Sequence, residues 1–137
     1  MRKRVLSNLL KCEYTHIYVN GEDINSYRHN GVHYLVLTEK EANNEAKRQI
    51  LNYIPLLNAD LINKHLKAEV NKKSLEPILN KWCENCLELL VLFINDYNEF
   101  INEAINIYGR GYFIGFNDKN EYQIKYKDVI YYIYRLI

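Results

Sequence analysis

The stretch that decides the fold is GRGYFIGFNDKNEYQIKYKDVIYYIYRLI, residues 109–137. Apolar residues recur at helical spacing before Gly109, and after it they alternate with polar residues as they do in strands. Three antiparallel strands are predicted, YFIGF (112–116), EYQIKY (121–126) and VIYYIYR (129–135), with turns at 117–120 and 127–128. Gly109 is expected to end the preceding helix, and Gly111 to let the backbone turn into this meander.

Tyrosines dominate the meander, and alternation divides them between its two faces. Tyr122 and Tyr126 share one face, while Tyr132 and Tyr134 share a face of the last strand. One set should pack on helices and the other should stay partly exposed; alternation leaves open which set faces out. Lys119 and the short turns favour solvent at one end, so we expect an interaction surface made of Arg110, Tyr112, Phe116, Tyr122 and Tyr126.

Helices are predicted upstream of the meander from their caps. Thr38 and Glu41 form a capping box, and Pro55 should end the helix that follows. The buried stripe of this helix is predicted at Ala42, Ala46, Ile50 and Tyr53. Asn58 can cap a shorter helix that carries His65, which we interpret as a hydrogen-bonded core histidine rather than a ligand or base.

Residues 75–108 carry a strong helical pattern that starts after Ser74 and includes Trp82. Asn95 or Asp96 can cap a second helix, so one long helix and two shorter helices are both open. Six acidic residues and one lysine lie between residues 74 and 108. The charge suits either a solvated helix face or an acidic surface that docks on a basic partner.

Two short strands are predicted near the start of the chain, THIYVNGEDI (15–24) and GVHYLVLT (31–38), with turns at Asn20-Gly21 and Asn30-Gly31. Together the elements predict an α+β fold. Three to four helices would pack on a small antiparallel sheet that ends in the three-stranded meander. A chain of 137 residues suits a single domain over residues 1–137.

The composition indicates which broad class of protein the chain belongs to. A hydrophobic fraction of 48% and a charged fraction of 26% are typical of a folded globular chain, and the net charge of +1 gives no strong global field. The first apolar run is too short for a signal peptide, and no stretch is long enough to span a membrane. Three cysteines without a secretion signal predict reduced thiols in a cytoplasm.

The cysteine and histidine motifs are weak indications of chemistry. WCENC at residues 82–86 falls inside a predicted helix, whereas a redox-active pair needs a helix N-terminus, so Cys83 and Cys86 are expected to be buried structural thiols. Cys12 and His16 could join them as zinc ligands, but close cysteine pairs in zinc sites usually lie on tight turns. We therefore predict no metal, no cofactor and no enzymatic activity.

Basic and aromatic residues interleave between Arg110 and Lys127, as they do on sheets that stack nucleic-acid bases. Five basic and three acidic residues over 109–137 are a weak charge for that purpose, and no ribonucleoprotein-type motif is present. Nucleic-acid binding is therefore the alternative function.

The order of segments resembles a family of small proteins of bacteriophages and prophages, over roughly residues 31–135. The shared features are a threonine-capped helix after a short strand, a Gly-Arg-Gly segment, an aspartate turn followed by Asn-Glu, and a Tyr-Tyr-Ile-Tyr-Arg ending. The matching positions are Thr38, Gly109, Arg110, Gly111, Asp118, Asn120, Glu121, Tyr131, Tyr132, Tyr134 and Arg135. Members often carry a histidine where Tyr112 stands and an Asp-Gly turn where this chain has Asp118-Lys119.

The resemblance implies a phage context and a fold pattern, and it implies no substrate. A small phage protein without a catalytic constellation is expected to bind a host protein in the bacterial cytoplasm. A defence complex is a natural target, which would make the chain an anti-CRISPR or anti-restriction inhibitor. Tyrosine-rich and acidic surfaces both suit such a contact.

Overall fold

The computed structural model describes residues 1–19, 25–67, 93–115 and 119–136 of the chain. Residue contacts divide the chain into two compact units: unit 1 holds Met1–Ala46 and Arg110–Ile137, and unit 2 holds Lys47–Gly109. Unit 1 is thus built from two distant parts of the sequence. The expected single domain over residues 1–137 stays a prediction.

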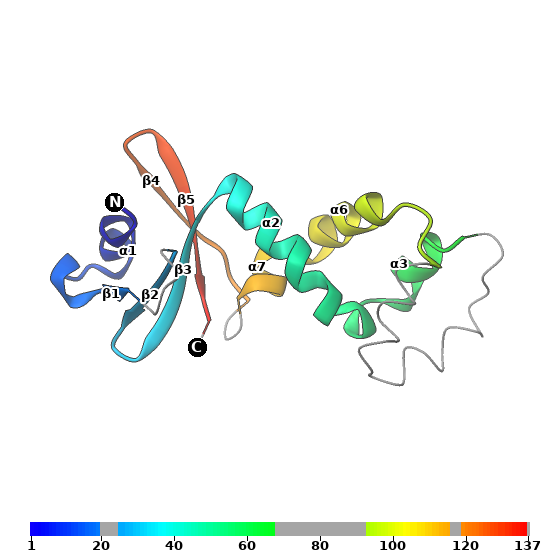
Figure 1. Cartoon of the computed structure of the whole chain (residues 1–137), viewed down its shortest axis with the longest axis horizontal. Coiled ribbons are helices and arrows are strands. Elements are labelled where there is room, and N and C mark those ends of the chain that lie inside the picture. Colours follow the sequence, from blue (N-terminus) through cyan, green and yellow to red (C-terminus); the bar gives the residue numbers. More distant parts are fainter. Residues whose placement is uncertain (20–24, 68–92, 116–118, 137) are drawn as a thin grey trace. The chain divides into compact units, whose positions relative to one another are not determined.

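Unit 1 contains a five-stranded antiparallel sheet with the strand order β1-β2-β3-β5-β4 (Figure 1). Its strands are β1 (Tyr18–Val19), β2 (Ser26–His29), β3 (Val32–Thr38), β4 (Tyr122–Tyr126) and β5 (Val129–Arg135). Its helical segments are α1 (Arg2–Leu10), the 3-10 helix η1 (Tyr14–His16), α7 (Arg110–Ile114) and the first part of α2 (Glu39–Gln49). The predicted α+β class is confirmed.

Two tight turns set the register of the sheet. Asn30 and Gly31 join β2 to β3 with φ of 49° and 76°, and Lys127 and Asp128 join β4 to β5 with φ of 49° and 65°. Positive φ at both central residues is the mark of the turn that matches the twist of a two-residue hairpin. Both turns fall where the sequence predicts them, whereas Asn20-Gly21 lies outside the described residues.

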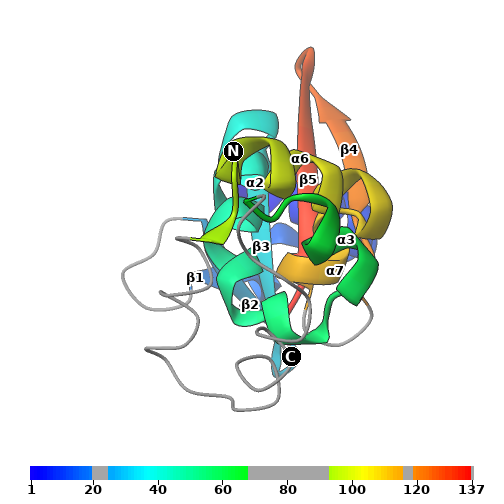
Figure 2. The same ribbon diagram turned by 90° about the vertical axis from the view of Figure 1, so that its right-hand side faces the viewer.

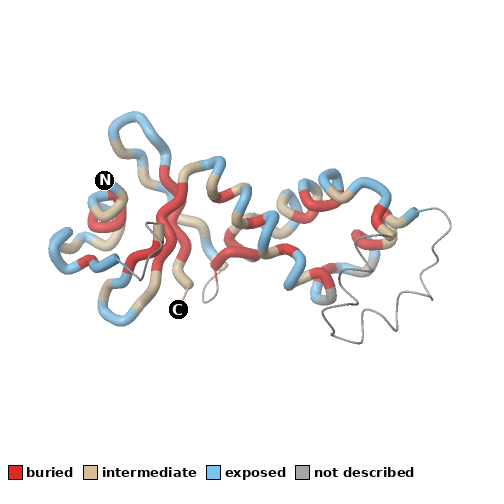
Figure 3. The backbone as a smooth tube through the Cα atoms, in the orientation of Figure 1, coloured by how far each residue is buried: buried red, intermediate tan, exposed pale blue. Residues whose placement is uncertain are grey.

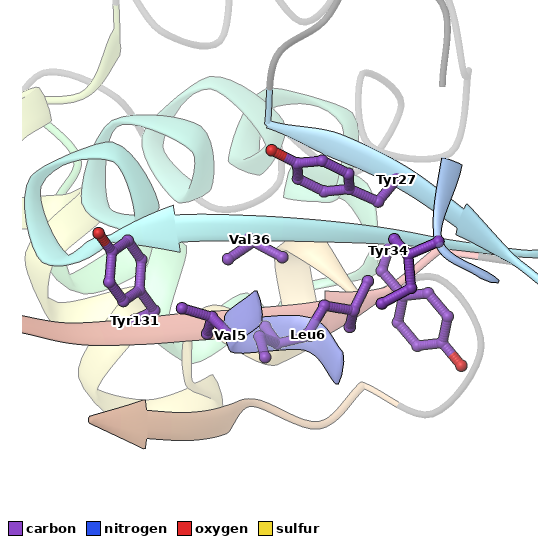
Figure 4. Packing of buried hydrophobic residues seen from close by; sticks show 8 residues of the cluster. Val5, Leu6, Tyr27, Tyr34, Val36 and Tyr131 are labelled. Atoms are coloured by element: carbon purple, nitrogen blue, oxygen red, sulfur yellow. The ribbon is translucent and has the colours of Figure 1, made fainter. Parts of the chain in front are cut away.

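The central strands β3 and β5 are covered on both faces. Four consecutive residues are buried in each strand, at 34–37 and 131–134 (Figure 3). Tyr131 belongs to a cluster with Val5 and Leu6 of α1 (Figure 4). Tyr132 and Tyr134 therefore point to the opposite face, since neighbouring residues of a strand alternate.

Helix α1 is absent from the sequence-based expectations. The first residues of the chain, which the sequence only shows to be unsuited to a signal peptide, form an amphipathic helix. Val5 and Leu6 lie on its buried side. Strand β2 was missed as well, because Ser26 and Tyr27 are both buried and give no alternation. Both elements are held by tertiary packing rather than by a local pattern.

The predicted strand at 112–116 is wrong, because residues 112–114 belong to the short helix α7 and Gly115 directly follows it. Gly111 and Gly115 lie four residues apart and share the face on which the returning chain packs. A Cβ on Gly111 would lie 2.5 Å from the carbonyl oxygen of Lys119, and one on Gly115 would lie 3.3 Å from the Lys119 Cα. Gly111 thus allows close packing and does not redirect the chain into a strand. In place of the predicted three-stranded meander, the described residues form a two-stranded hairpin of β4 and β5.

The described residues of unit 2 form helices and one isolated antiparallel bridge, between Leu66 and Ile94. Unit 2 holds the end of α2, the 3-10 helices η2 (Ile50–Asn52) and η3 (Ile54–Leu56), and the helices α3 (Ala59–Lys64) and α6 (Tyr97–Tyr108). The Asn58 side chain accepts a hydrogen bond from the Asp60 amide, and the Asp96 side chain accepts one from the Glu99 amide. Both predicted caps are confirmed, so α6 begins as a helix of its own and the alternative of one uninterrupted helix over 75–108 is wrong.

Several predictions lie outside the described residues. They are the helix after Ser74, the core role of Trp82, the reduced state of Cys83 and Cys86, and the position of Phe116. Within the part that is described, no helix has the length and apolar character needed to cross a membrane.

Candidate functional site

Arg110 stands at the centre of a polar cluster in unit 1. Its Nη1 donates to Glu39 Oε1 at 2.9 Å and to Asn43 Oδ1 at 3.0 Å, and its Nη2 donates to Glu121. Its guanidinium carbon lies 4.3 Å from the centre of the Tyr132 ring. One arginine thereby joins α2, the segment before β4, and β5.

Tyrosine hydroxyls complete the cluster. Tyr134 is fully buried and donates to Glu121 Oε1 at 3.0 Å; burial raises its pKa, and the Glu121 carboxylate raises it further. A hydrogen bond from Tyr132 and the charge of Arg110 outweigh burial and hold the pKa of Glu39 below its ordinary value. Burial alone would lower the pKa of Arg110. Its tyrosine and carboxylate partners raise the pKa by more, so the net pKa lies above its ordinary value.

The cluster changes the role expected for Arg110. Its side chain is only 11% exposed, and its partners belong to the same unit. The expectation that Arg110 lies exposed beside a tyrosine surface is therefore wrong. Glu121, Tyr132 and Tyr134 thus serve, with Arg110, the folding of unit 1.

The predicted surface tyrosines are half-buried. Tyr112 meets Phe113 edge-to-face with ring centres 5.3 Å apart, and Lys119 Nζ lies 5.3 Å from the centre of the Tyr112 ring. Tyr122 and Tyr126 lie on the face of β4 that packs against the α1 cluster. The predicted alternation in β4 is confirmed, yet the tyrosine face is the partly buried one and the lysine face is exposed.

The exposed apolar residues of the C-terminal hairpin lie at its turn. Val129 is 41% exposed and Ile130 is 45% exposed, and alternation puts them on opposite faces of β5. Lys127 Nζ lies 5.6 Å from the centre of the half-buried Tyr126 ring. Figures 1 and 2 show this turn projecting beyond the other strands of unit 1. We call Tyr126, Lys127, Val129 and Ile130 the hairpin end.

Strand β4 is also an edge strand. Within the described sheet it pairs only with β5, through the register Tyr122↔Ile133 to Tyr126↔Val129. The backbone groups on its other side are directed away from the described sheet. An edge of this kind can accept an additional strand from a partner, and the charge of Lys125 limits unspecific pairing.

Unit 2 contains a second polar cluster, around Glu103 of α6. Lys64 Nζ donates to Glu103 Oε1 at 2.7 Å, and His65 Nε2 forms a hydrogen bond with Glu103 Oε2. Phe100 covers the imidazole edge-to-face with ring centres 5.6 Å apart. Hydrogen bonds from Lys64 and His65 hold the pKa of Glu103 below its ordinary value.

The interpretation of His65 as a hydrogen-bonded core histidine is confirmed, because the residue is 7% exposed and bound to Glu103. A cleft of about 400 Å³ lies beside this cluster. Its lining residues are Asn58, Asp60, Leu61, Lys64, Glu103, Ile107 and Tyr108. Glu103 and Tyr108 already hold partners within the unit, since the Tyr108 hydroxyl accepts from the Asn58 amide at 2.8 Å.

No metal site is formed by the described residues. Cys12 is half-buried and His16 is exposed, and the other two candidate zinc ligands, Cys83 and Cys86, lie outside the description. Among the residues that the structure describes, no three His, Cys, Asp or Glu side chains gather as metal ligands.

No protein-family model, curated protein or solved structure matches this chain.

Proposed function

We propose that the chain acts by stoichiometric binding to a host protein, as a phage-type inhibitor of a bacterial defence complex such as a CRISPR effector or a restriction enzyme. In this proposal it works in the cytoplasm of the bacterial cell and catalyses no reaction. The observation that carries the binding role is the hairpin end, where Val129 and Ile130 are exposed beside Tyr126 and next to β4, whose outer edge has no paired strand in the described sheet.

The chemistry of this surface suits a protein partner. Aromatic and aliphatic side chains supply most of the energy at protein interfaces, and an open strand edge adds backbone hydrogen bonds. The polar clusters around Arg110 and Glu103, by contrast, use their hydrogen bonds within their own units. The phage context rests on the sequence resemblance alone.

Affinity capture from the infected host tests the proposal. The tagged chain is expected to retain one host protein or complex in fixed proportion, identified by mass. A variant that combines Val129→Ser with Ile130→Ser should weaken this binding by about 2 kcal/mol or more, as loss of interface anchors does. Retention of no host protein would contradict the proposal.

Ile107→Ser is the matched control for Ile130→Ser. Ile107 is an isoleucine of α6 that is 61% exposed, against 45% for Ile130, so its replacement removes at least as much exposed apolar area, from unit 2. We expect it to leave partner binding unchanged. Equal losses from Ile107→Ser and Ile130→Ser would remove the hairpin end as the binding surface.

A second candidate function is nucleic-acid binding. The observation in its favour is a set of lysines placed over tyrosine rings, at Tyr112 and at Tyr126. Salt separates the two candidates, because affinity for phosphates falls steeply from low to moderate salt and a largely apolar protein interface does not.

A further inference from the structure

Helix α1 is fixed in its rotation by Arg2. The Arg2 guanidinium donates to the Val36 carbonyl at 2.7 Å and binds both carboxylate oxygens of Glu41 at 2.9 Å and 2.8 Å. The Tyr131 hydroxyl donates to Met1 Sδ at 3.1 Å. Because successive helix residues turn by about 100°, an inward Arg2 directs Lys3 and Arg4 away from the sheet.

The outward cations converge on Tyr14 of η1. Lys3 Nζ lies 5.9 Å from the centre of the Tyr14 ring, and the guanidinium carbon of Arg4 lies 5.3 Å from it. The Tyr14 side chain is nevertheless 47% exposed. Cations held beside an exposed ring offer a stacking surface and positive charge at one place.

Lys11 extends this surface along the helix. It is the exposed C-cap residue that follows α1, with a left-handed backbone (φ of 52°), about 10 Å along the axis from Arg4. Among the described residues, no carboxylate forms an ion pair with Lys3, Arg4 or Lys11. Their charge is therefore not neutralised by the described fold, unlike that of Arg2 and Arg110.

We propose that Lys3, Arg4, Lys11 and Tyr14, the α1 surface, bind single-stranded nucleic acid. The cations would contact phosphates while an unstacked base lies against Tyr14 or the Arg4 guanidinium. A duplex keeps its bases stacked and cannot use the ring in this way. A membrane is less suited, because Leu9 and Leu10, the other apolar residues of α1, pack against the core cluster and leave no apolar helix face for lipid.

This inference rests on the second candidate function for its class of ligand and adds the surface that binds it. It is independent of the hairpin end. If nucleic acid binds through Lys119 and Lys127 and not through the α1 surface, the second candidate stands and the inference fails.

The test measures fluorescence anisotropy of labelled single-stranded DNA and RNA oligonucleotides of about 16 nucleotides with the full chain. Tyr14→Ala should weaken binding about tenfold, and Tyr14→Phe should preserve it because the ring remains. Arg4→Gln and Lys11→Gln should each make the dependence of log affinity on log salt about 0.7 less steep. Binding of duplex DNA should be insensitive to Tyr14→Ala.

Lys125→Gln is the matched control, because it removes one positive charge from the exposed face of β4, opposite to α1. Circular dichroism of each variant checks the fold. The inference is overturned if the oligonucleotides do not bind, if Lys125→Gln reduces affinity as much as Arg4→Gln, or if Tyr14→Ala has no effect. Binding to phosphatidylserine vesicles but not to oligonucleotides would also overturn it.

Discussion

Glu121 in unit 1 and Glu103 in unit 2 each accept hydrogen bonds from two side chains, but in different surroundings. The partners of Glu121 are Arg110, whose side chain is 11% exposed, and the fully buried Tyr134. The partners of Glu103 are the buried His65 and Lys64, whose side chain is 66% exposed. The two carboxylates are themselves similarly exposed, at 23% for Glu121 and 26% for Glu103, so the difference lies in their partners: both partners of Glu121 are largely buried, whereas Glu103 links a buried histidine to a lysine at the surface.

The largest expected effect is that of Arg110→Ala. The change removes the hydrogen bonds of a mostly buried guanidinium and leaves Glu121, which is 23% exposed, without its cation, so we expect a loss of about 3 kcal/mol in the free energy of unfolding. Urea denaturation followed by circular dichroism measures it. Arg4→Ala, which removes an exposed arginine, should change this free energy by less than about 0.5 kcal/mol. Similar losses from both variants would make the Arg110 cluster unimportant for folding.

His65→Ala tests the cluster of unit 2. It removes a buried ring that contacts Phe100 and leaves Glu103 with Lys64 alone, so a loss of about 1–3 kcal/mol is expected. Lys64→Ala should cost less than about 1 kcal/mol, because an exposed ion pair contributes little. The same denaturation measurement applies, and a larger loss from Lys64→Ala than from His65→Ala would reverse the assignment.

Gly111→Ala probes the packing beside Arg110. The added methyl group would lie 2.5 Å from the Lys119 carbonyl oxygen, so the segment before β4 must shift. Overpacking of this kind costs about 1–3 kcal/mol. Thermal unfolding should show the loss, and an unchanged midpoint would mean that residues 119–120 adapt without strain.

Acid should weaken the Glu103 cluster. The pKa of Glu103 is lowered in the folded state, so its contribution to stability is present above the ordinary value of 4.5 and is lost as pH falls through the lower folded value. Glu103→Gln should therefore make unfolding midpoints less sensitive to pH in this acidic range. A variant whose acid sensitivity equals that of the parent chain would contradict the assignment.

The sequence predicts the elements that local chemistry controls. The caps at Thr38, Asn58 and Asp96 and the hairpin turns at Asn30-Gly31 and Lys127-Asp128 all depend on one or two residues acting on their own backbone. The alternation of β4 follows from the pleat of a strand. These features need no knowledge of the rest of the chain.

Features that depend on distant parts of the chain were missed. Helix α7 resembles a strand in composition. The sign of a helix is that Gly111 and Gly115 lie four residues apart, and both approach the backbone of Lys119 closely. Arg110 looked exposed because its acidic partners lie 71 residues before it and 11 residues after it. The exposed pairing of Lys3 and Arg4 with Tyr14 depends on α1, which was not predicted.

Hydrogen–deuterium exchange of the chain with and without its captured host protein tests the central claim most directly. The claim is that the interior tyrosines of β5 serve the fold and the hairpin end serves binding. We predict that the partner adds protection at residues 122–130, where the edge strand and the hairpin end lie, and leaves residues 131–134 unchanged because they are already buried. New protection confined to unit 2, with none at residues 122–130, would contradict the account.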